Sequence, residues 1–179
     1  MTTLADQLHR RLAADGVPVH DWRRPATRSV DDLAREIERG ESEISFGPPL
    51  RKLRIVRLQI ERGGLVLHEL ELHEDDGRSL IRNRPPAEKL LADEDPIVGA
   101  LRGAIEELGV EPERVQVLEA IEQGVDRLDN NPGYPGLATE YEIHLARMTI
   151  DGLPDTDFET VENETGPGGR RVVHRWGWR

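Results

Sequence analysis

The sequence contains no cysteine, which excludes disulfide bonds, thiolate metal sites and cysteine nucleophiles. It also has no stretch that approaches the roughly 20 apolar residues of a membrane-spanning helix. The first seven residues carry Asp6 and lack the apolar segment of a signal peptide. We therefore expect a cytoplasmic protein with no membrane partner.

Basic residues are in deficit: 24 Lys and Arg stand against 35 Asp and Glu, for a net charge of −11. This balance argues against a nucleic-acid partner, because neutralising phosphates requires clustered Lys and Arg. An acidic protein can still bind a phosphorylated small molecule when a metal ion supplies positive charge. The length of 179 residues, with 36% hydrophobic and 33% charged residues, suits one soluble globular unit.

Two helices are expected at the start of the chain. Leu4, Leu8 and Leu12 have helical spacing, and Gly16 follows as a stop. A second helix is expected to begin after Ser29 and to end at Gly40. We interpret residues 1–43 as an N-terminal helical extension that packs on the remaining domain, 44–179, or on a partner subunit, which makes a homodimer reasonable.

From Ile44 onward the pattern favours strands. Apolar and polar residues alternate across a hairpin that turns at 62–64, and shorter strands follow. The expected strands are 53–60, 65–73, 79–81, 115–118, 139–150 and 171–178. Loops are expected over 82–95, 130–136 and 162–170. This order of strands, one helix and more strands predicts an α/β (α+β) fold with a mixed sheet and helices packed on it.

The best helix signal lies between these strands. Asp95 is expected to cap the helix, Pro96 suits its first position, and Gly109 suits its C-terminal end. Away from the apolar face, Gly103, Glu106 and Glu107 share one side through i,i+3 and i,i+4 spacing. Carboxylates on such a face can hold Mg²⁺ or Mn²⁺, although adjacent glutamates are also common on solvated helix ends.

The segment from Glu88 to Val110 resembles the Nudix box, the signature of the Nudix hydrolase superfamily. That signature is Gly, five residues, Glu, seven residues, Arg-Glu, an aliphatic, any residue, Glu-Glu, any residue, Gly and an aliphatic. Here Glu94, Arg102, the Glu106-Glu107 pair and Gly109 fall in register. The motif covers 23 residues, and the order of strands extends the likeness over about residues 50–179. The resemblance implies a Nudix-like α/β/α sandwich.

Two positions depart from the signature, so the box is degenerate. Its opening Gly is Glu88 here, and the Glu that follows its Arg is Gly103. In the family that Glu is a principal metal ligand. The resemblance therefore implies a magnesium or manganese site built on Glu106 and Glu107 with Glu94 or Glu88 in support, and with Arg102 orienting the glutamates.

Other acids are candidates for the missing carboxylate. Glu140, Glu142 and His144 are expected on one face of a strand, and Glu159 and Glu162 lie further along the chain. Tyr134, in the loop before that strand, could cover a substrate or form a structural turn. The basic run Arg51, Lys52, Arg54 and Arg57 could bind phosphates or pair with surface carboxylates.

Three functions stay open on the sequence. The first is a divergent Mg²⁺-dependent hydrolase of a diphosphate linked to another group, such as a nucleotide or prenyl diphosphate, with Glu106, Glu107 and Arg102 in catalytic roles. The second is a catalytically silenced Nudix-like domain that binds a ligand or partner. The third is a Nudix-fold enzyme with non-hydrolytic chemistry in specialised metabolism. These alternatives stay open because Gly103 stands where the signature has a metal-binding Glu.

Overall fold

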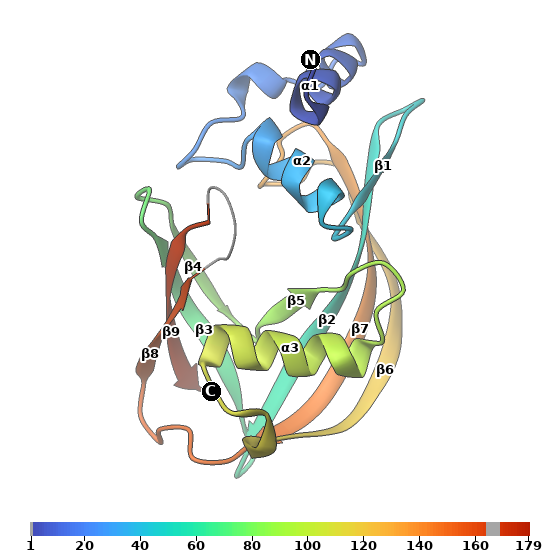
Figure 1. Cartoon of the computed structure of the whole chain (residues 1–179). Coiled ribbons are helices and arrows are strands. Elements are labelled where there is room, and N and C mark those ends of the chain that lie inside the picture. The colour runs from blue at the N-terminus through green and yellow to red at the C-terminus, as the bar shows by residue number, and fades with distance from the viewer. Residues whose placement is uncertain (1, 164–168) are drawn as a thin grey trace.

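The computed structural model describes residues 2–163 and 169–179 (Figure 1). Three α-helices, two 3₁₀ turns and nine strands follow one another in these ranges. In chain order the elements are α1 (Leu4–Ala14), η1 (Val19–Asp21), α2 (Val30–Glu38), β1 (Glu43–Ser45), β2 (Leu50–Arg62), β3 (Leu65–Glu74), β4 (Ser79–Arg84), β5 (Ala87–Lys89), α3 (Pro96–Leu108), η2 (Pro112–Arg114), β6 (Val115–Leu128), β7 (Ala138–Ile150), β8 (Phe158–Asn163) and β9 (Arg171–Trp178).

The strands form one open mixed sheet, which confirms the predicted α/β (α+β) class, while the Nudix-like α/β/α sandwich stays a prediction. The order along the main path is β6-β7-β2-β3-β9-β8, with β1 and β5 on β2 and β4 on β3. β2 and β7 are parallel, and the other pairs are antiparallel. None of the helices in the described ranges is long and apolar enough to cross a bilayer.

The β2–β3 hairpin divides the sheet into two halves. The two strands pair only beside their turn, at Glu61 with Val66 and Arg62 with Leu65. Beyond these pairs β2 follows β7 and β5, whereas β3 follows β9 and β4. The halves therefore diverge from a shared base and leave a space between them, with α3 lying across its lower part and α2 at its open end (Figure 1).

Local sequence fixes both ends of α3 as predicted. The Asp95 side chain accepts a hydrogen bond from the backbone of Ile97, at 2.7 Å. Pro96 takes the first turn, where its missing N–H is not needed. Gly109 ends the helix with φ of +63°, a left-handed conformation that glycine adopts without strain.

The main core lies between α3 and the sheet. Ala100, Ala104 and Leu108 of the helix are buried against residues of β2, β7 and β9. Gly99 allows the helix to approach the segment after β5, because a Cβ there would lie only 2.2 Å from Leu90 Cδ2. Close packing of this kind fixes the position of α3 relative to β5.

The N-terminal helices belong to a second apolar cluster. Thr3 and Ser29 begin α1 and α2 with capping boxes, so both helices have local start signals. Their buried faces pack together with Tyr134 and Leu137 from the loop before β7. The division into an extension of 1–43 and a domain of 44–179 stays a prediction.

Several strands correct the sequence interpretation. The expected loop over 82–95 is wrong in its first part, because Arg82–Arg84 continue β4 and 87–89 form β5 against β2. β6 runs on to Leu128 instead of ending at residue 118, and β8 is a strand that the sequence pattern does not predict. These strands depend on pairing with distant partners rather than on local alternation. Of the expected loop 162–170, residues 164–168 lie outside the described residues, and 162–163 belong to β8.

Helix α2 connects the two halves of the sheet through buried ion pairs. At one end Asp32 pairs with Arg24 at 2.8 Å, and Arg24 also pairs with Glu74 of β3. At the other end Glu36 accepts hydrogen bonds from Arg51 of β2, at 2.6 Å, and from Lys89 of β5, at 2.8 Å. α2 is therefore linked directly to β2 and β5 through Glu36, and to β3 through Arg24.

We expect Glu36→Gln to lower the free energy of unfolding by about 3 kcal/mol, because it removes the buried carboxylate that pairs with Arg51, Lys89 and Arg28. Burial opposes the ionisation of Glu36, but Lys89 and Arg51 lower its pKa to about 2. Its contribution should therefore be complete above its unfolded pKa of 4.5 and disappear as the pH falls towards 2. Urea unfolding from pH 3 to 8 measures this. Glu38→Gln, exposed on the same helix, should change little, and an equal effect of both variants would contradict the assignment.

Candidate functional site

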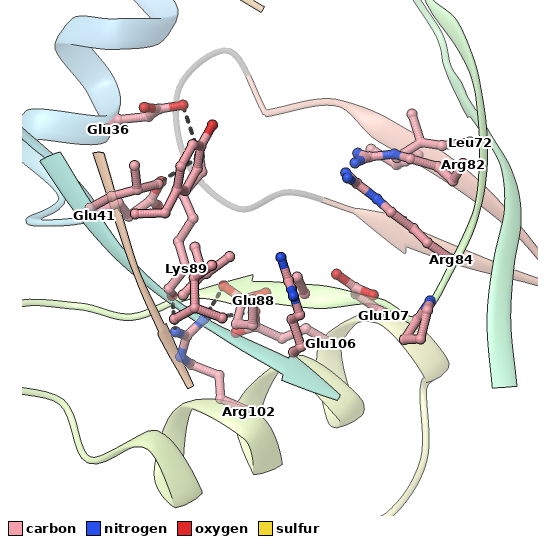
Figure 2. Close-up of a pocket in the computed structure, with 18 of the residues that line it drawn as sticks. Glu36, Glu41, Leu72, Arg82, Arg84, Glu88, Lys89, Arg102, Glu106 and Glu107 are labelled. Atoms are coloured by element: carbon pink, nitrogen blue, oxygen red, sulfur yellow. Dashed lines mark hydrogen bonds and ion pairs between the residues drawn. The ribbon is translucent and has the colours of Figure 1, made fainter. Parts of the chain in front are cut away.

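A cavity of about 1300 Å³ lies between the two halves of the sheet. Its floor carries Glu88 of β5 and Glu106 and Glu107 of α3, and its opposite wall carries Arg82 and Arg84 of β4 (Figure 2). Towards α2, the cavity is lined by side chains that include Glu36 and Tyr134. The cavity thus has an acidic floor and a basic wall.

Arg102 organises the acidic floor. Its guanidinium group lies 2.9 Å from both Glu88 and Glu94 and 3.4 Å from Glu106. It also donates to the backbone carbonyl of Lys89. These contacts, with their opposite charges, raise the pKa of Arg102 above its ordinary value. Arg102 therefore orients the glutamates, including the i,i+4 contact to Glu106 expected from the sequence.

Both carboxylate oxygens of Glu94 accept hydrogen bonds, so its role in the structure is to hold neighbouring groups. Its Oε1 accepts from Arg102, and its Oε2 accepts from Arg102 and from the backbone N–H of Leu91. It is not among the residues that line the cavity. Glu94 thus holds the guanidinium group in place, while the supporting metal role expected for it from the sequence remains a prediction.

Glu88 occupies the space above Gly103. A Cβ built on residue 103 would lie 2.9 Å from the Cβ of Glu88 and 3.4 Å from its Oε2. Oε1 of Glu88 accepts a hydrogen bond from Arg102, and no hydrogen bond to Oε2 is found among the described residues. The carboxylate of Glu88 therefore lies where a side chain at position 103 would otherwise extend.

Glu107 lies on the cavity floor without a partner for its carboxylate in the described part of the chain. Burial raises its pKa well above the usual range, and the negative charges of Glu88 and Glu69 add to the effect. Burial likewise raises the pKa of Glu88 to about 7, against the opposing effect of Arg102. Burial, with a smaller contribution from neighbouring carboxylates, thus disfavours the charged forms of Glu88 and Glu107, and a bound cation would favour them.

His174 of β9 supports the acidic region from the other half of the sheet. Its ring nitrogens lie 2.7 Å from Glu69 and 3.2 Å from Glu162. Burial opposes protonation, but these hydrogen bonds raise the pKa of His174 to about 9. Of the acids considered to replace the missing box carboxylate, Glu162 lines the cavity and Glu159 does not.

The acidic row on β7 lies away from the cavity. Glu142 accepts from Arg54 at 3.1 Å and contacts His144 at 2.9 Å, while Glu140 pairs with Lys52 at 3.5 Å. None of these three β7 side chains lines the cavity, whereas their neighbours Tyr141 and Ile143 do. Of the basic run, Arg51, Lys52 and Arg54 thus pair with carboxylates, whereas Arg57 lines the cavity, as Arg51 also does. Phosphate binding by this run stays a prediction.

Tyr134 does line the cavity, at the end covered by α2. It is 1% exposed, and its hydroxyl donates to Glu36 at 3.1 Å. Trp22 packs against its ring with centroids 5.2 Å apart. Tyr134 is therefore a fixed part of the wall, held by a buried polar network.

The sequence did not indicate four of the residues that surround the site. Arg82 and Arg84 fell in an expected loop, and Glu69 and His174 lie on strands far apart in the chain. The alternation along 65–73 and 171–178 could have placed Glu69 and His174 on inward faces, but only the pairing of β3 with β9 brings them together. Tertiary contacts thus define this half of the site.

Neither a scan of protein-family models nor a search of curated proteins gives a match to this chain. The described residues hold no set of three or more acidic or histidine side chains already gathered as metal ligands. The donors present nevertheless suit a hard divalent cation. Glu88 and Glu107 offer carboxylate oxygens that no described residue hydrogen-bonds, which is the ligand type that Mg²⁺ and Mn²⁺ prefer.

Proposed function

We propose that this chain is a divergent Nudix-type hydrolase that cleaves a diphosphate linked to another group with the help of Mg²⁺ or Mn²⁺. The observation that carries the proposal is the pair of incompletely satisfied carboxylates, Glu88 and Glu107, facing Arg82 and Arg84 across one cavity. Acids and guanidinium groups on opposite sides suit a metal-bound, negatively charged phosphoryl substrate.

Each floor residue has a distinct task in this proposal. Glu88 and Glu107 hold the cation, and Glu106, which is half-exposed, contributes from the rim. Arg102 and Glu94 fix the position of Glu88. A bound cation supplies Lewis acidity and lowers the pKa of a water molecule. His174 keeps Glu69 and Glu162 in place beside the floor.

A silenced, ligand-binding domain is the second candidate. One observation favours it: Arg102 already neutralises Glu88 and Glu106 in part, so a cation would compete with an ion pair. Under this alternative the cavity binds a phosphorylated molecule without turning it over.

We expect wild-type protein to release phosphate or a nucleoside or prenyl monophosphate from at least one linked diphosphate with Mg²⁺ or Mn²⁺, and to lose this activity in EDTA. Glu107→Gln should reduce kcat/KM by about 100-fold, because it removes a metal carboxylate. A panel of nucleoside and prenyl diphosphates with product analysis measures this.

Glu113→Gln is the matched control, since Glu113 is exposed in η2 outside the cavity. Binding of a panel compound without turnover would support the silenced domain. Turnover that survives both EDTA and Glu107→Gln would overturn the metal role of the floor.

A further inference from the structure

Two arginines of β4 point into the cavity side by side. The guanidinium groups of Arg82 and Arg84 extend from the wall into the cavity, above the acidic floor (Figure 2). They belong to the half of the sheet opposite β2 and β7. Any molecule that reaches from the floor to this wall meets both positive charges.

A β-bulge lies at this position in β4. Glu69 pairs with Arg84 and Glu71 with Ile81, so Arg82 and Asn83 both stand opposite Leu70. Asn83 has φ of +46°, in the left-handed region that Asn tolerates better than most residues. Bulges of this kind change the direction of side chains next to them.

Neither arginine has its donors satisfied within the described residues. Arg84 makes no ion pair or side-chain hydrogen bond there, although it lines the cavity. Arg82 lies 3.5 Å from Glu69 through Nε, yet that buried Nε donates no hydrogen bond. Two adjacent like charges with donors to spare are stabilised by a shared anion.

We propose that Arg82 and Arg84 form a binding site for the terminal phosphate of the substrate. This inference rests on the proposed function, which identifies the substrate as a diphosphate, and it narrows the class of substrate. It selects compounds whose diphosphate ends in a free phosphate, such as nucleoside or prenyl diphosphates. A diphosphate esterified at both ends lacks the dianionic group that two guanidinium groups bind best.

The binding test uses inorganic pyrophosphate in EDTA, so it does not depend on metal or turnover. Calorimetry of wild type should show binding that Arg84→Ala weakens by about tenfold or more, the effect of losing one or two charge-assisted hydrogen bonds. Arg84→Lys should recover part of it. Arg175→Ala is the control, because Arg175 lies on β9, outside the cavity, and pairs with Glu71.

Kinetics then test the substrate class. Arg84→Ala should raise KM by about tenfold for a nucleoside diphosphate and leave KM for a dinucleoside diphosphate within about twofold. Equal pyrophosphate affinity in wild type and Arg84→Ala, with both well folded, would overturn the site. If pyrophosphate binding depends on Arg84 but the protein hydrolyses no compound of the panel, Arg82 and Arg84 form an anion site. That result would refute only the proposed enzymatic activity.

Discussion

Gly103→Glu, which brings the box closer to the Nudix signature, should inactivate the protein rather than improve it, and the exchange Glu88→Gly with Gly103→Glu should recover activity. A Cβ at 103 would lie 2.9 Å from the Cβ of Glu88, too close for both side chains. We expect Gly103→Glu to lower the free energy of unfolding by about 1–3 kcal/mol, as overpacked sites do.

The double variant Glu88→Gly with Gly103→Glu should restore one carboxylate at this place, carried by α3 instead of β5. We expect its kcat/KM within about tenfold of wild type, against about 100-fold loss for Glu88→Gly alone. Alanine at 88 is not a sufficient partner, because the Cβ of residue 88 itself makes the close contact. Glu88→Ala with Gly103→Glu should therefore remain destabilised.

Glu88→Gly with Gly103→Ala is the control that separates packing from chemistry. It should recover stability without activity, because the space is filled but the carboxylate is lost. Urea unfolding and steady-state kinetics on the five variants measure both effects. Full activity in Gly103→Glu alone, or none in the exchanged pair when it folds normally, would show that Glu88 does not take the place of a carboxylate from position 103.

Glu107→Gln should make the metal-free protein more stable while it removes activity. Burial raises the pKa of Glu107 in the folded state, so the folded protein holds this proton more tightly than the unfolded chain. In EDTA, the Glu107 carboxyl group therefore lowers the free energy of unfolding of wild type as the pH rises above 4.5, the pKa of this group in the unfolded chain. Glutamine has no proton to lose and avoids that cost.

The gain in the free energy of unfolding over wild type should be absent below pH 4 and grow as the pH rises towards 8. Excess Mn²⁺ should stabilise wild type and leave Glu107→Gln unchanged, because only a folded metal site gains from mass action. Thermal unfolding in EDTA and in Mn²⁺ across this pH range measures both effects. Glu113→Gln, the control, should have the stability of wild type at each pH. A Glu107→Gln protein less stable than wild type at every pH would contradict the half-buried, unpaired position of Glu107.

Local signals allowed α3 and its caps to be predicted from the sequence, since Asp95, Pro96 and Gly109 act within one turn of the helix. The strands that depend on distant partners could not be predicted in the same way. β5 has only three residues and forms because Glu88 and its neighbours pair with β2. The two prolines before β5 and the charges within it are typical of a loop when the partner strand is unknown.

The same division holds for the site. Arg102 and Glu106 meet through helical spacing, so their contact follows from the sequence. The contact of Glu88 with Gly103 joins β5 to α3 and depends on how closely the helix packs. In the sequence, Glu88 and Gly103 are two separate departures from the Nudix signature. In the structure these two residues are in contact.

The most direct test of the proposed metal site on the cavity floor is anomalous diffraction from crystals soaked in Mn²⁺. We predict a peak in contact with the carboxylates of Glu88 and Glu107, on the cavity side of α3, that is absent in Glu107→Gln crystals. A peak confined to other carboxylates, or none at saturating Mn²⁺ with both side chains ordered, would contradict a metal site on this floor.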